Sequence, residues 1–203
     1  MKLLVSIIMM FAGVILHAGE YYIPEVGRSV KPRMKVVQTE QRHGYECRYV
    51  EFDVEKGERI SAYLLVPDGT SRRSRKPAVV MLHDHGARFD IGKEKLVRPM
   101  VSMLPGGSED HIARSAQQWI DKNFDGVYFA DSLASLGYVV LVADALYWGE
   151  RSSVDAKRWS ELTYGQFDDD KDAARARKQE IKRLKNVVYE GQCDVYDSLQ
   201  RDG

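Results

Sequence analysis

The chain has 203 residues, of which 44% are hydrophobic and 30% are charged, a composition typical of globular proteins. Thirty lysines and arginines balance thirty aspartates and glutamates, so no net charge attracts nucleic acid or an anionic membrane. From these values we expect one domain and no nucleic-acid partner.

The first 18 residues have the pattern of a secretory signal peptide. Lys2 precedes an apolar run from Leu3 to Leu16, and Ala18 and Gly19 provide a small-residue cleavage region. The run is shorter than the ~20 residues of a membrane span. We expect cleavage after Ala18, export, and no integral membrane span thereafter. A retained N-terminal anchor is the alternative.

Two cysteines, Cys47 and Cys193, are present, and export would permit a disulfide between them. Spacing does not show whether their Cα atoms lie within bridging distance. Cys47 alternates with Tyr45 and Tyr49 along an expected strand, which equally favours a half-buried, inert thiol. Both alternatives stay open.

Residues 19–40 contain Pro24 and Pro32 and predict an irregular lead-in. Two alternating segments follow, Tyr45–Val54 and Ile60–Val66, and predict an antiparallel hairpin with Ile60, Ala62, Leu64 and Val66 on one face. The next loop is basic, and we interpret it as solvated rather than as a phosphate site. Its cations are Arg72, Arg73, Arg75 and Lys76.

The segment PAVVMLHDHGA, Pro77 to Ala87, begins with a short apolar run between turn signals. Such a run predicts a strand buried on both faces of a parallel sheet. YVVLVA, Tyr138 to Ala143, predicts a second strand of the same kind. Strand, crossover helix and strand form a βαβ unit, in which ligands bind at the carboxyl ends of the strands. The turns 83–87 and 144–151 are therefore the candidate site.

Three helices are predicted after the first buried strand. The first is capped by Ser108 and continues through Ile120; the second covers Val127–Leu136, with Phe129, Ala130, Leu133 and Leu136 toward the sheet and Gly137 as its C-cap. The third is the charged segment Asp168–Asn186, with Ile181, Leu184 and Val188 on one line. It is either a solvent-covered helix or a lid above the site.

Four segments in this order resemble the N-terminal half of an α/β-hydrolase of the dienelactone hydrolase and acetyl-xylan-esterase group. They are RISAYLLVP (Arg59–Pro67), PAVVMLHDHGA (Pro77–Ala87), GKEKL (Gly92–Leu96) and LGYVVLVADALYWGERS (Leu136–Ser152). The resemblance covers about residues 40–203. It implies a three-layer αβα fold in which an antiparallel hairpin leads into the parallel βαβ unit. It also implies an exported bacterial serine esterase, periplasmic or extracellular and without a cofactor, acting on small-molecule or carbohydrate esters.

The resemblance also assigns site residues. His83-Asp84-His85-Gly86 matches the family's His-Gly-x-Gly pattern, which makes the backbone N–H of His85 the oxyanion donor, with Ala87 as the alternative. Asp84 replaces the usual first glycine and brings a negative charge near the expected oxyanion. His83 is expected to be a packed histidine at the strand end. Asp144, Trp148 and Gly149 would bind substrate at the rim of the pocket.

No serine lies in the G-x-S-x-G pattern of a nucleophile elbow. The nearest imitation, Gly191-Gln192-Cys193-Asp194-Val195, lacks the second glycine and has no histidine after it, so we reject a catalytic Cys193. We expect residues 41–203 to be a partial hydrolase domain that stops before the elbow. Its nucleophile, acid and base would lie beyond Gly203, and this chain alone would be inactive.

Two other functions stay open. Histidines two apart on a strand share a face, so His83, Asp84 and His85 could serve a metal-dependent hydrolase. Neither His43 nor His111 stands in a ligand motif, and we predict no metal site. The other alternative is a degenerate, non-catalytic binding module that keeps the sheet without the chemistry. Nothing in the sequence indicates the oligomeric state.

Overall fold

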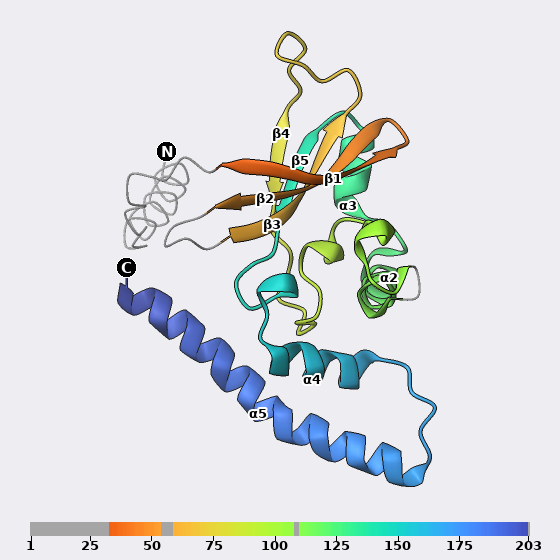
Figure 1. The fold of residues 1–203 in the computed structure, drawn as a ribbon, viewed down its shortest axis with the longest axis vertical. Coiled ribbons are helices and arrows are strands. Elements are labelled where there is room, and N and C mark those ends of the chain that lie inside the picture. The colour runs from red at the N-terminus through yellow and green to blue at the C-terminus, as the bar shows by residue number, and fades with distance from the viewer. Residues whose placement is uncertain (1–32, 54–58, 108–109, 203) are drawn as a thin grey trace, which may run out of the picture.

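The computed structural model describes residues 33–53, 59–107 and 110–202. Within them, five strands form one mixed sheet with helices beside it (Figure 1). The strands are β1 (Met34–Arg42), β2 (Tyr45–Asp53), β3 (Arg59–Pro67), β4 (Ala78–Met81) and β5 (Val139–Ala143). The helices are α2 (His111–Phe124), α3 (Phe129–Ser135), α4 (Val154–Tyr164) and α5 (Lys171–Asp202), with 3-10 turns η3 (Lys93–Lys95), η4 (Val101–Met103) and η6 (Gly149–Arg151).

The strand order across the sheet is β1-β2-β3-β5-β4. The first three strands form an antiparallel meander, β3 pairs antiparallel with β5, and β5 pairs parallel with β4. The connection from β4 to β5 contains α2 and α3. The predicted α/β class, with a hairpin leading into a parallel pair, is therefore confirmed.

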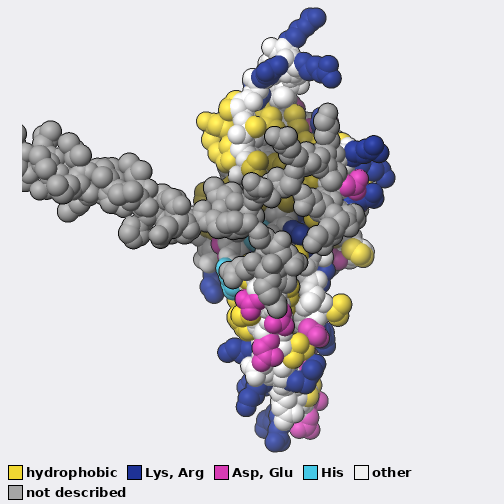
Figure 2. All heavy atoms as spheres, turned by 90° about the vertical axis from the view of Figure 1, so that its left-hand side faces the viewer, with side chains coloured by type: hydrophobic (Ala, Val, Ile, Leu, Met, Phe, Trp, Pro, Cys, Tyr) yellow, Lys and Arg dark blue, Asp and Glu magenta, His cyan; other side chains and the backbone are white. Residues whose placement is uncertain are grey.

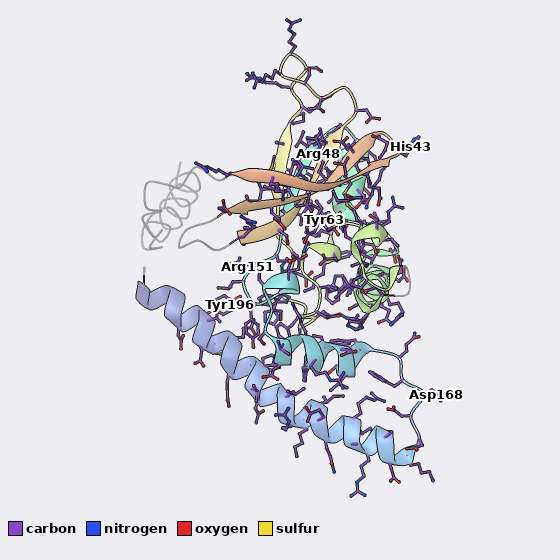
Figure 3. The ribbon with its side chains drawn as sticks, in the orientation of Figure 1. His43, Arg48, Tyr63, Arg151, Asp168 and Tyr196 are labelled. Atoms are coloured by element: carbon purple, nitrogen blue, oxygen red, sulfur yellow. The ribbon has the colours of Figure 1, made fainter. Side chains whose placement is uncertain are left out.

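One face of the sheet carries the main core. In register across it, Leu65 of β3 pairs with Val140 of β5, and Tyr63 pairs with Val142; all four are buried. Helix α3 and the chain after η3 cover this face. Tyr63 points from β3 toward that chain (Figure 3), where its hydroxyl accepts the N–H of Met100 at 3.2 Å.

The alternation predicted for β3 did not show which of its residues enter the core. Leu64 and Val66 are only half-buried, whereas Tyr63 and Leu65 are nearly inaccessible. Both faces of β3 are apolar or aromatic, so alternation alone did not identify the covered one.

The prediction of a strand buried on both faces at 78–82 was wrong. β4 is the last strand of the sheet, and the Val80 side chain is 70% exposed. Helices α4 and α5 pack against each other beyond the carboxyl ends of β4 and β5 rather than on the sheet (Figure 1). The sheet is open at β4, next to the candidate site.

β1 was missed, because residues 34–40 were assigned to the irregular lead-in. The strand pairs with β2 along its length, but its register shifts between Val36 and Gln38. This irregularity breaks the alternation that would have identified a strand. Most of β1 is exposed, which further weakens the pattern.

Helix ends differ from the predictions in two places. The N-cap of α2 is Asp110, which accepts the Ile112 N–H at 2.8 Å; the predicted cap, Ser108, lies outside the described residues, as do residues 1–32. α3 ends with Gly137 in the left-handed region, as predicted. Phe129 and Leu136 are exposed rather than packed on the sheet.

The predicted charged helix is α5, which extends to Asp202. Leu184 and Val188 are buried, and Ile181 packs beside them, in a second core formed with α4 and the chain after β4. Its other side carries charges of both signs, as expected of a solvated surface (Figure 2). The basic loop between β3 and β4 projects from the molecule, and its cations are exposed at the tip (Figure 2).

None of the helices in residues 33–53, 59–107 and 110–202 is both long and apolar enough to span a membrane. The expected signal peptide lies in the part of the chain that the structure does not describe.

The two cysteines are free, with Cys47 buried and Cys193 exposed on α5, so the alternative of a disulfide is wrong. Burial raises the pKa of the Cys47 thiol to about 12, which suppresses the reactive thiolate. In the native protein we expect one thiol equivalent, Cys193, to react rapidly with Ellman's reagent at pH 8. The second should react only after denaturation. A Cys193→Ser variant that still reacts rapidly when native would contradict this burial.

Candidate active site

The turn after β4 (residues 83–87, the β4 turn) reverses the chain through two residues in the left-handed region. Gly86 has φ +47° and Ala87 φ +49°. A Cβ at Gly86 would lie 2.3 Å from the ring of Trp119. Glycine is therefore required at position 86 both by backbone conformation and by the close approach of an aromatic ring.

His83 joins the β4 turn to the turn after β5 (residues 144–151, the β5 turn). Its Nε2 accepts the Ala145 N–H at 3.0 Å, and its Nδ1 lies 2.9 Å from the carbonyl oxygen of Asp84. These partners require a proton on Nδ1 and none on Nε2. Burial lowers the pKa of His83 below 6.5, consistent with the neutral ring and the packed role expected from the sequence.

Lys95 of η3 lies beneath the β4 turn with its side chain fully buried. Its Nζ donates to the carbonyl oxygens of Asp84 at 3.1 Å and of His85 at 3.0 Å. The indole Nε1 of Trp148 also donates to the His85 carbonyl, at 2.8 Å. The ammonium lies 5.0 Å from the ring centroid of Trp119, a cation–π distance. Burial lowers the pKa of Lys95 to about 8.

Lys93, two residues earlier, anchors the β5 turn. Its buried Nζ lies 2.9 Å from both Asp144 and Glu150 and 3.2 Å from Glu94. Burial disfavours the charged ammonium, but the carboxylates raise the Lys93 pKa well above its ordinary value. Asp144 also accepts the backbone N–H groups of Lys93 at 2.7 Å and Glu150 at 3.0 Å.

Two glycines allow the backbone to approach the Asp144 carboxylate. A Cβ at Gly92 would lie 2.3 Å from an Asp144 oxygen, and one at Gly149 would lie 2.5 Å from the other. Gly149 also has φ +55°. These glycines keep the chain after β4 and the β5 turn close together, so the two turns predicted from the sequence do meet.

The predicted site residues lie close together in the structure but differ in solvent exposure. His85 is exposed, and its ring packs edge-on against Trp148 with 5.0 Å between centroids. Trp148, Asp144 and Gly149 are buried beneath the turn, and the Asp144 carboxylate is engaged by internal donors. The Ala87 N–H lies 3.4 Å from His85 Nδ1. Contacts of these residues with substrate stay predictions.

The sequence analysis missed three residues that shape this site. Lys93 and Lys95 were quoted only as part of a matching segment, and Gln192 of α5 lies with its amide nitrogen 3.0 Å from His85 Nε2. A usable signal was present, because the two lysines stand in a loop among apolar residues and glycine, where a charge needs a buried partner.

A cavity of about 320 Å³ lies beside the Lys93 network, and the following residues line it: Tyr49, Tyr63, Asp90, Glu94, Met103, Leu104, Ile112, Gly149, Glu150 and Lys157. Burial raises the pKa of Glu94. At Glu150 burial alone would raise the pKa of the carboxyl group. The Lys93 ammonium and hydrogen bonds outweigh burial, so the pKa of Glu150 is lowered overall. The cavity therefore combines aromatic walls with carboxyl groups of differing acidity.

Comparisons with known proteins give little beyond the structure itself. No family model and no curated protein matches the chain. One solved structure, provisionally described as an acetyl xylan esterase from Bacteroides fragilis, is similar to it with 18% identity and a TM-score of 0.42. The match covers 63% of this chain and 28% of that one.

Replacing Gly86 by alanine should damage the β4 turn more than replacing Gly69. Both glycines have positive φ, but a Cβ at Gly69 meets nothing within 4 Å. Gly69→Ala should therefore lower the free energy of unfolding by only about 1 kcal/mol, the cost of a side chain at positive φ. Denaturant unfolding measures this change. Gly86→Ala should lower the free energy of unfolding by about 1–3 kcal/mol more, because the new methyl group overpacks against Trp119. Equal losses would contradict the close approach.

Removing the Asp144 carboxylate should leave the Lys93 ammonium buried with too few partners. We expect Asp144→Ala to lower the free energy of unfolding by about 3–5 kcal/mol, measured by denaturant titration. Glu180→Ala is the control, since Glu180 pairs with Arg183 on the exposed side of α5 and its removal should change the free energy of unfolding little. A loss at Asp144 no larger than at Glu180 would refute the anchoring role.

Proposed function

We propose that this chain supplies the oxyanion side of an exported carboxylic-ester hydrolase that acts on acetylated carbohydrates. The observation that supports it best is the β4 turn, whose carbonyl groups at Asp84 and His85 are bound from below by Lys95 and Trp148. Backbone N–H groups of the same turn are then available to a ligand at the carboxyl end of a parallel strand. Ester hydrolysis needs such preorganised donors where negative charge develops.

In this proposal an attacking hydroxyl converts the ester carbonyl into a tetrahedral oxyanion beside the β4 turn. N–H groups of the turn donate to that oxygen and stabilise it. The buried ring of Trp148 and the side chain of Phe89 limit the water beneath the turn. In such a site, hydrogen bonds to the developing charge are stronger than in bulk water.

We place the nucleophile, its base and its acid outside these 203 residues, because no serine stands in an elbow pattern. The open edge of β4 beside the turn supports this placement, since no strand within the described residues pairs with it. A strand added there would end on the same side as the β4 turn if it ran parallel to β4.

The metal-dependent alternative would have to disrupt this arrangement. Both ring nitrogens of His83 are already within hydrogen-bonding distance of backbone groups, so ligation by His83 would break the link between the two turns. Within the described ranges, no three His, Cys, Asp or Glu side chains are gathered as a ligand set.

The test compares this chain with a protein extended by the codons that follow Gly203 in its gene. We expect the extended protein to hydrolyse 4-nitrophenyl acetate and release acetate from acetylated xylan, and the 203-residue chain to do neither. In the extended protein, Gly86→Ala should lower kcat about 100-fold or more, with KM less affected. Gly69→Ala is the matched control.

Three outcomes would contradict the proposal. An extended protein without esterase activity would favour a non-catalytic binding module. Activity that is lost on chelation and restored by a metal ion would favour the metal-dependent hydrolase. Hydrolysis by the 203-residue chain itself would show that the nucleophile is within it.

A further inference from the structure

Two consecutive peptide groups of the β4 turn accept hydrogen bonds from the same cation through their carbonyl oxygens. The oxygens of Asp84 and His85 lie 3.1 Å and 3.0 Å from the Lys95 ammonium. All described peptide bonds are trans, and in a trans peptide the C=O and N–H point in opposite directions. The N–H groups of His85 and Gly86 therefore both point away from Lys95.

We propose that Lys95 is a positioning residue: by holding both carbonyl oxygens inward it makes the N–H groups of His85 and Gly86 a paired donor site for a carboxylate or tetrahedral oxyanion. Its catalytic meaning rests on the proposed function, whereas the anion site stands on the geometry. Adjacent backbone N–H groups that point to the same side bind anions in many proteins.

The pairing differs from the one expected from the sequence, which named His85 and, as an alternative, Ala87. The Ala87 N–H is directed to the imidazole Nδ1 of its neighbour His85 at 3.4 Å. Gly86 has no side chain and lies against Trp119, so its peptide has little freedom to rotate. Gly86 therefore replaces Ala87 as the second donor.

Lys95 also offsets the unfavourable charge of Asp84, the residue that stands where the family pattern has glycine. The carboxylate of Asp84 is 44% exposed and lies 3.9 Å from the Lys95 ammonium. An anion bound to the turn would meet the repulsion of Asp84 and the attraction of a buried cation. The cation acts through a protein interior that screens it less than water does.

Burial of the ammonium lowers the pKa of Lys95 to about 8. The charged and titratable side chains that act on it come from both turns and the chain between: His83, Asp84, Arg88, Asp90 and Asp144. Above pH 8 Lys95 loses its charge and one proton, so the affinity of the turn for an anion should fall.

The test uses trifluoroacetate, which stays a monoanion from pH 6.5 to 9.5 and is observed by ¹⁹F NMR. Backbone ¹H–¹⁵N spectra at pH 6.5 locate its binding, and we expect the largest shifts at His85 and Gly86. The dissociation constant should rise about tenfold in Lys95→Met and severalfold in the native sequence at pH 9.5. Lys95→Met should show no change with pH above 7. Asp84→Asn should bind several times more tightly.

Lys178→Met is the control, since it removes an exposed lysine of α5 and should leave affinity and pH dependence unchanged. Should Lys95→Met not fold, Trp148→Phe removes the indole donor to the His85 carbonyl, together with part of a buried ring, and should weaken binding about threefold. Folded Lys95→Met with native affinity would overturn the proposal. So would shifts confined to residues outside the turn, or an unchanged affinity of the native chain at pH 9.5.

The binding experiment is independent of hydrolysis. Trifluoroacetate bound at His85 and Gly86, together with an inactive extended protein, would refute the proposed function and leave the positioning role of Lys95 intact. An active extended protein in which Lys95→Met lowers neither anion affinity nor kcat would refute the positioning role alone.

Discussion

The ammonium of Lys93 and the carboxylate of Asp144 form the interaction on which the rest of the site depends. They lie 2.9 Å apart, and both side chains are almost completely buried. Burying either charge alone would cost several kcal/mol, so each is tolerated only in the presence of the other. Asp144 follows β5 and Lys93 belongs to the chain after β4, so the ion pair fixes the two strand ends together.

Lys95 belongs to the same short 3-10 turn as Lys93 but binds different groups. Lys93 faces the carboxylates at the end of β5, whereas Lys95 faces the carbonyl groups of the β4 turn. Rings of Trp119 and Trp148 flank it at 5.0 Å and 5.8 Å. One rigid segment thus anchors the β5 turn through a carboxylate and shapes the β4 turn through backbone oxygens.

Much of the fold could be predicted from the sequence, because its local patterns agree with the structure. The hairpin β2–β3, the strands β4 and β5 and the apolar line of α5 all follow from alternation or helical spacing. The exposure of β4 could not be predicted, because a short apolar run has the same appearance at the edge of a sheet as at its centre. β1 was hidden by its register shift at Val36.

That the two turns would meet was predictable from the sequence, but the contacts that hold them together were not. Strand ends at 83 and 144 identified the two turns, since ligands gather at carboxyl ends of parallel strands. Nothing local indicated that Lys95 contacts residues 84 and 85, eleven and ten positions earlier, or that Gln192 of α5 reaches His85. Such contacts depend on how α5 and the η3 turn pack in three dimensions, and neither periodicity nor motif spacing carries that information.

In the proposed function, these supports would order the oxyanion side of the site independently of the nucleophile. The hydrogen bonds described above that orient the β4 turn join His83 to Ala145, Lys95 to two carbonyl groups, and Trp148 to one of them. None of them involves the free edge of β4. A nucleophile on a strand added at that edge would therefore act beside donors that are already in position. The free energy of ordering these donors would then not add to the activation barrier of the chemical step.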